Sequence, residues 1–87
     1  MTEEEFIIIR RIELNNQNLL RLISNIEQIK DVNEIKRIHD ELIIKIEQLT
    51  IEIQRMKSPH AKEYLSKVQY GLIEMLSTIE EFYCVTN

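Results

Sequence analysis

Hydrophobic residues recur along most of the chain in alternating steps of three and four, the spacing that places side chains on one face of an α-helix. The pattern covers three stretches, at about residues 3–30, 32–57 and 59–84. The repeated positions are Ile8, Ile12, Asn15, Leu19, Leu22, Ile26 and Ile29, then Val32, Ile35, His39, Leu42, Ile46, Leu49, Ile53 and Met56, then Ala61, Leu65, Val68, Leu72, Met75, Ile79 and Phe82. We therefore expect three helices, each burying one apolar stripe against the other two.

The boundary between the second and third stretches is marked by Ser58 and Pro59. Serine is a favoured N-cap, and proline is favoured at the first helical position because its missing N–H would have no partner there. Proline also pushes the preceding residue out of the α region, which ends the helix before it. A new helix is therefore expected to begin at Pro59.

The boundary between the first and second stretches falls at residues 30–33. A step of four is due after Ile29, but the next residue of the pattern, Val32, follows after three. Asp31 and Glu34 also have the spacing of a capping box, in which two side chains satisfy each other's backbone N–H groups. A turn explains the short step most simply. The alternative is a stammer in one long, continuous helix.

The composition favours a helical protein. Of the 87 residues, 44% are hydrophobic, which is ample apolar surface to offset chain entropy and argues against disorder. The single glycine follows Tyr70, so the tight turns of a β-rich fold are missing. Short connections between helices favour antiparallel neighbours. The predicted fold is all-α: one domain over residues 1–87, an antiparallel three-helix bundle with coiled-coil-like packing.

Charge and the terminal segment bear on the compartment and on the class of partner. The formal net charge of −4 argues against nucleic acid, whose phosphates favour a basic face. The chain starts with three glutamates after Thr2, unlike a signal peptide, and its longest apolar run, residues 6–9, is far too short to span a membrane. A lone cysteine, Cys84, cannot form an internal disulfide, so we expect a cytoplasmic protein.

The outer faces of two helices carry more apolar residues than a solitary bundle needs. If the seam of the second helix holds the a and d positions, Ile44 and Ile51 both fall at f, directly opposite the core. In the first helix, Ile7, Leu14 and Leu20 lie off the seam at b and c. Burying one isoleucine side chain is worth ~1.5–3 kcal/mol, so a symmetric contact using four of them would matter energetically. We predict a protein interface at these five residues, and a homo-oligomer ahead of a foreign partner.

The surroundings of these residues lead to a functional hypothesis. Glu41, Glu47 and Gln48 form an acidic and polar rim, which limits the surfaces that can dock and disfavours anionic lipid. We predict a non-enzymatic accessory, adaptor or regulatory protein. It would form a homodimer or bind another protein through helix–helix contacts, without binding nucleic acid directly.

Polar residues and a glycine interrupt the predicted seams. Asn15 and Asn16 lie mid-seam in the first helix and predict a polar layer that fixes the register between helices, with a ligand pocket as the alternative. His39 occupies an a position of the second helix. Gly71, inside the third helix, costs ~1 kcal/mol relative to alanine. We expect it to allow the close approach of a neighbouring backbone or a bulky side chain.

The sequence carries no recognisable catalytic motif, cofactor site or metal site. No Ser/His/Asp or Cys/His set has positional support, and no glycine-rich phosphate loop surrounds Gly71. Two histidines and one cysteine are too few and too dispersed for a zinc site. We therefore predict no catalytic residue, no cofactor and no metal ligand.

The segment Ile38-His39-Asp40-Glu41-Leu42 resembles the phospho-acceptor box of dimerising histidine-kinase helices, where a histidine followed by an acidic residue precedes an apolar position. That family uses a helical hairpin that dimerises into a four-helix bundle and transfers phosphate through the histidine. The resemblance implies that His39 is the acceptor and that Asp40 orients or deprotonates its imidazole. No proline follows the box, and the seam position of His39 implies burial, whereas an acceptor must reach solvent.

Residues 11–13 (Arg-Ile-Glu) and 19–23 (Leu-Leu-Arg-Leu-Ile) are similar to the opening of the first helix of all-helical chorismate mutases, which have similar length and dimerise through that helix. The resemblance implies a site in which several inward-facing cations bind a dicarboxylate. The sequence shows no further Arg and Lys set at matching positions, and the C-terminal glutamine of that family is absent. This enzyme is the more remote alternative function.

Overall fold

A computed structural model describes residues 2–83, except for the side chain of Phe82. Cys84 and the predicted end of the third helix at residue 84 lie outside the described residues. The described part contains α1 (Glu3–Ser24), the short 3-10 helix η1 (Ile26–Gln28), α2 (Val32–Arg55) and α3 (Pro59–Tyr83), and no strand. The prediction of an all-helical protein with three long helices is confirmed.

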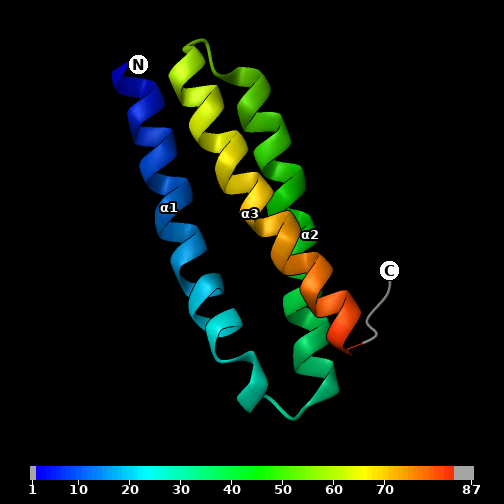
Figure 1. The fold of residues 1–87 in the computed structure, drawn as a ribbon. Helices are drawn as coiled ribbons and strands as arrows, with labels where there is room; N and C mark the ends of the chain where they lie inside the picture. The colour runs from blue at the N-terminus through cyan, green and yellow to red at the C-terminus, as the bar shows by residue number, and fades with distance from the viewer. Residues whose placement is uncertain (1, 84–87) are drawn as a thin grey trace.

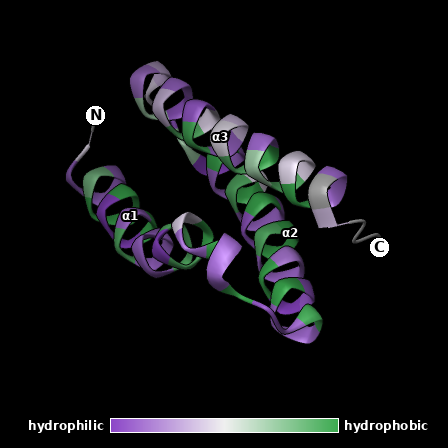
Figure 2. Ribbon diagram, turned by 60° about the horizontal axis from the view of Figure 1, so that its bottom comes forward, coloured by the Kyte–Doolittle hydropathy of each residue, from purple (hydrophilic) through white to green (hydrophobic). Residues whose placement is uncertain are grey.

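The three helices lie side by side in an elongated body of 43 × 20 × 15 Å (Figure 1). The closest packing is between α2 and α3, whereas α1 makes fewer contacts with each of them. The start of α1 and the turn between α2 and α3 lie at one end of the molecule, and η1 lies at the other (Figure 1). Hydrophobic and hydrophilic residues alternate along every helix (Figure 2), as the spacing predicts.

The core is made by residues of all three helices. Its most completely buried large side chains are Ile38, His39 and Leu42 of α2 and Leu65 of α3. The seam predicted for α2 is buried or half-buried except at Val32, which is 69% exposed at the first residue of the helix. The other buried apolar residues are Ile9, Leu19, Ile35, Leu49, Met56, Ala61, Leu72 and Ile79.

The first helix begins at a capping box that our sequence interpretation missed. The Thr2 hydroxyl accepts the Glu5 N–H at 3.1 Å, and the Glu5 carboxylate accepts the Thr2 N–H at 3.1 Å. The same carboxylate accepts the N–H groups of Lys57 and Ser58, at 3.2 and 3.1 Å. These bonds lower the pKa of Glu5 to about 2, and the bond from the Ser58 N–H contributes most to the shift. Glu5 therefore fastens the start of α1 to the turn between α2 and α3.

The end of α1 is a correction, because the helix stops at Ser24 and not near residue 30. The Ser24 hydroxyl and the Asn25 amide both donate to the carbonyl of Arg21, at 2.8 and 3.2 Å. Serine and asparagine compete with the helical backbone in this way and favour helix ends. Ile26 and Ile29 still pack against the core from η1 and its connection, so the apolar spacing continues where the α-helix has already ended.

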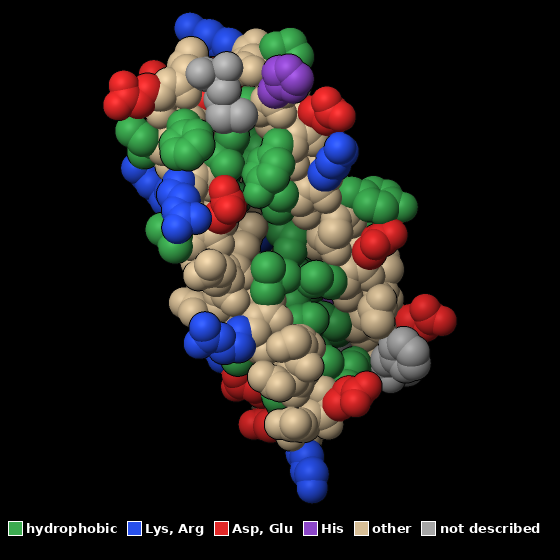
Figure 3. All heavy atoms as spheres, turned by 60° about the vertical axis from the view of Figure 1, so that its left-hand side comes forward, with side chains coloured by type: hydrophobic (Ala, Val, Ile, Leu, Met, Phe, Trp, Pro, Cys, Tyr) green, Lys and Arg blue, Asp and Glu red, His purple; other side chains and the backbone are tan. Residues whose placement is uncertain are grey.

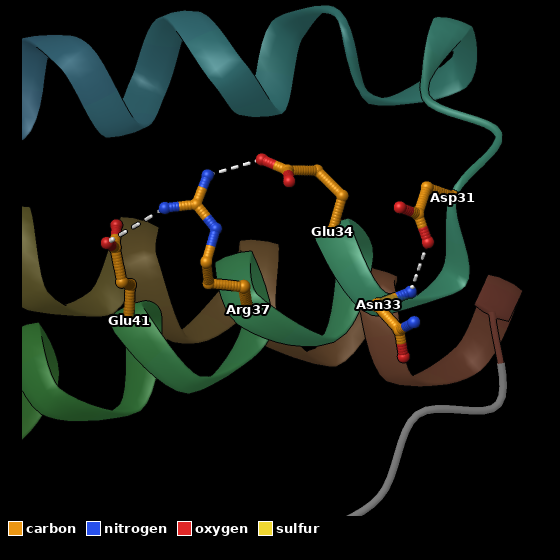
Figure 4. A network of polar contacts seen from close by, with 5 residues as sticks. All are labelled: Asp31, Asn33, Glu34, Arg37 and Glu41. Carbon is orange, nitrogen blue, oxygen red and sulfur yellow. Dashed lines mark hydrogen bonds and ion pairs between the residues drawn. The ribbon is translucent and has the colours of Figure 1, made fainter.

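A break between the first two helices is confirmed, since α2 begins at Val32 as a separate helix. Asp31 is its N-cap and accepts the Asn33 N–H at 2.9 Å (Figure 4). The expected reciprocal bond from Glu34 is not formed: that carboxylate pairs with Arg37 instead (Figure 4). The start of α2 is therefore capped by one side chain in place of a full capping box.

The third helix begins at Pro59, as predicted. The expectation for Gly71 is wrong within the described part of the chain: a Cβ built there would have no atom within 4 Å. Gly71 instead lines two open recesses between α1 and α3. The glycine therefore does not serve close packing between these helices.

Candidate protein-interaction surface

The two isoleucines predicted as the centre of an interface are both exposed on α2. Ile44 is 52% exposed and Ile51 is 55% exposed. Seven residues of α-helix make almost two turns and rise about 10.5 Å, so the two side chains stand in line. Leu42 and Leu49, each two residues earlier, are buried. Two residues correspond to about 200° around a helix, so the isoleucines face away from the core.

The polar rim around these isoleucines is partly neutralised. Glu41 is half-buried, and its Oε1 lies 3.8 Å from Nη1 of Arg37 (Figure 4). Arg37 also bonds to Glu34, which raises the pKa of the guanidinium above its ordinary value. Glu47 and Gln48 are exposed, and Glu47 makes no ion pair within residues 2–83. The free negative charge beside the isoleucines therefore comes from Glu47 and from exposed Asp40, which lies one turn before Ile44.

The three residues predicted on α1 are exposed but do not share one face. Ile7 and Leu14 are 53% and 49% exposed and stand one heptad apart. Leu20, 39% exposed, is six residues after Leu14 and hence about 120° away around the helix. It lines a recess between α1 and α3 together with Tyr64. Ile44 instead borders a recess between α1 and α2. The structure thus aligns Ile44 with Ile51 on α2 and Ile7 with Leu14 on α1. Leu20 belongs to neither pair.

An apolar groove between α1 and α3 was not anticipated from the sequence. Its two parts, about 350 and 580 Å³, share Gly71 and Met75 in their linings. Tyr64 and Leu20 line one part, and Ile23 lines the other. Figure 3, seen from the α1 side of the molecule, shows a hydrophobic strip along the body with charged side chains on both flanks. The amphipathic pattern indicates which face of each helix is apolar, but not that two of these faces are incompletely closed.

A second unanticipated feature is a recess of about 340 Å³ between α1 and α2, which we call the basic recess. Arg11 lines it from α1, and Lys45 and Arg55 line it from α2. Asn16 of α1 also lines it. No sequence motif connects these residues, because they lie on two different helices and the packing of those helices determines which cations share a recess. The sequence alone therefore did not predict that these cations line one recess.

The polar residues of the first seam divide into one buried and one exposed asparagine. Asn16 is 5% exposed, whereas Asn15 is exposed. The buried face of α1 is centred one residue later than predicted, since Ile9 is buried and Ile8 is half-buried. Of the two asparagines, Asn16 is therefore the one that contributes a polar group inside the bundle.

His39 is completely buried, with 0% of its surface exposed. Its Nδ1 lies 3.5 Å from Asp40 and its Nε2 lies 3.3 Å from Glu80, but neither nitrogen makes a hydrogen bond with a described residue. Phosphotransfer needs an imidazole nitrogen that a phosphate donor can reach. The burial of His39 therefore weighs against the phospho-acceptor role implied by the histidine-kinase resemblance.

Comparisons with protein-family models, with curated proteins and with solved structures found no match for this chain. Within residues 2–83, no helix combines the length and the apolar character needed to cross a membrane. The surfaces described above are therefore the guide to what the chain does.

Proposed function

We propose that this chain is a non-enzymatic accessory or regulatory module of the cytoplasm that acts through helix–helix contacts. In this proposal residues 1–87 form one domain, an antiparallel, coiled-coil-like bundle, and two copies pair through the outer face of α2. The observation that carries the proposal is the line formed by Ile44 and Ile51, each about half exposed on the side away from the core.

Self-association needs more apolar contact than Ile44 and Ile51 alone provide. Complete burial of an isoleucine side chain is worth ~1.5–3 kcal/mol, so covering the exposed half of four of them is worth ~3–6 kcal/mol. Association itself costs at least ~4 kcal/mol in lost translational and rotational freedom. The α2 pair alone therefore does not suffice for a stable dimer, and further apolar contact is needed. Ile7 and Leu14 are further exposed apolar residues, on the neighbouring helix α1.

The rim determines which copies or partners fit. Glu47 is exposed beside the isoleucines and makes no ion pair with a described residue, so two copies must pair in a register that keeps their Glu47 side chains apart. The charge on Glu41 is already shared with Arg37 and contributes less to this selection.

The test is sedimentation velocity of the full chain at increasing concentration. We expect a sedimentation coefficient that rises with concentration for the natural sequence and stays monomeric for Ile44→Glu/Ile51→Glu. The matched control is Tyr70→Glu/Ile73→Glu, which adds the same charges at exposed positions of α3, 64% and 41% exposed. Circular dichroism checks that both variants keep their helices. A chain that is monomeric at every concentration, or an equal effect of the two double variants, would overturn the proposal.

A further inference from the structure

The basic recess contains two cations without a carboxylate partner. Arg11 is exposed and Lys45 is half-buried, and neither forms an ion pair with any described residue. The third cation, Arg55, lies 3.4 Å from Glu52, which also lines the recess. This pair compensates itself, so Arg11 and Lys45 leave a net positive charge on opposite walls of the recess.

The recess also contains an amide that has no hydrogen-bond partner among the described residues. Asn16 is 95% buried, since only 5% of its surface is exposed, and it makes no side-chain hydrogen bond within the described part of the chain. Its amide oxygen and nitrogen are not among the described polar atoms that are both fully enclosed and unbonded, so the amide is accessible from the recess. Asn16 lines the basic recess, where a bound molecule could supply that partner.

The remaining lining of the basic recess is mainly apolar. Its apolar residues are Ile8, Ile12, Leu49 and Ile51, and its polar residues are Asn15 and Gln48. The volume of about 340 Å³ is at the lower end of the range of ~300–1,000 Å³ typical of ligand pockets. Such a site suits a small molecule that combines an apolar body with an anionic group.

We propose that the basic recess binds a small organic carboxylate with an apolar or aromatic body. The carboxylate lies between Arg11 and Lys45, and the body lies against Ile8, Ile12 and Leu49. The amide of Asn16 hydrogen-bonds to a polar substituent of the ligand. The recess borders the proposed pairing face, since Ile51 and Gln48 line it, whereas Ile44 does not.

The test is a titration of the full chain with benzoate, followed by amide chemical shifts in ¹H–¹⁵N spectra. Benzoate carries one carboxylate on an aromatic ring, acetate has the carboxylate without the ring, and benzamide has the ring without the charge. We expect saturable shifts from benzoate at the recess, with a dissociation constant on the order of 1 mM. Acetate and benzamide should each bind at least about tenfold more weakly, since each keeps half of the recognised features.

Substitutions locate the binding. Arg11→Gln and Lys45→Gln should each weaken benzoate binding about fivefold or more, because each removes one of the two unpaired cations. Arg10→Gln is the matched control, since Arg10 is exposed, pairs with Glu13 at 4.0 Å and does not line the recess. Shifts that do not saturate, equal binding of acetate, or an equal effect of Arg10→Gln and Arg11→Gln would overturn the inference.

The two proposals fail separately. Ile44→Glu/Ile51→Glu tests pairing by sedimentation, whereas the benzoate titration is carried out on Ile44→Glu, in which the recess lining is unchanged. Retained benzoate binding in this variant supports the recess independently of pairing. Loss of binding there, with the helices intact, would contradict a separate site.

Discussion

Replacing Gly71 by alanine should stabilise the protein. Gly71 lies in the interior of α3, where glycine is the least favourable residue apart from proline because of its backbone freedom. A Cβ built there has no atom of the described residues within 4 Å. The added methyl group therefore neither collides with a neighbour nor gains packing contacts.

The expected magnitude follows from these two facts. Alanine is ~0.8–1.0 kcal/mol more favourable than glycine in a helix interior, and no packing change is expected to alter this value. The free energy of unfolding should therefore rise by about 1 kcal/mol. In a domain of this size, such a change raises the Tm by about 4–8 °C.

The assay is thermal and urea unfolding of Gly71→Ala, followed by circular dichroism at a concentration low enough to keep the chain monomeric. Ser77→Ala is the control, because Ser77 is exposed on the same helix and the exchange gains only about half as much helix propensity. A lower Tm for Gly71→Ala would refute the reasoning, because it would mean that α1 or another segment approaches the glycine closely.

Two further predictions concern buried ionisable groups. Glu5 has a pKa of about 2 in the folded chain, against an ordinary value of 4.5, so its stabilising bonds are fully present above pH 4.5 and are lost as the pH falls towards 2. The difference in urea midpoint between the natural sequence and Glu5→Gln should therefore become smaller as the pH falls from 4.5 towards 2. A difference that does not change with pH would contradict the hydrogen bonds described for Glu5. His39→Leu should raise the free energy of unfolding by about 1–2 kcal/mol, since the substitution removes a buried imidazole with two unbonded nitrogens. Loss of stability in the urea unfolding of this variant would show that the imidazole is held by Glu80.

The helices themselves were predictable because their signals are local. Pro59 starts α3 as its preference for the first helical position indicates, and the short step after Ile29 marks a real break. The early end of α1 was missed because Ile26 and Ile29 keep the helical spacing and still contact the core. Apolar spacing indicates which side chains pack against the core, and such side chains continue beyond the end of the α-helix.

The candidate sites were predictable only in part. The exposure of Ile44 follows from its position opposite the seam of its own helix, and the structure agrees. Arg11 and Lys45 line the same recess because of the way α1 packs against α2. The sequence pattern of either helix alone does not determine that packing. The capping role of Glu5 was readable from Thr2 three residues earlier, whereas its bonds to the α2–α3 turn depend on tertiary structure.

The attachment of α1 determines how the molecule opens. This helix is fastened at its start by Glu5 and is continuous at its far end with η1, but it makes fewer contacts along its length than α2 and α3 make with each other. Its backbone amides should exchange with deuterium before those of the other two helices, as a separate cooperative unit. The packed pair of α2 and α3 would then persist as a native-like intermediate while α1 is detached.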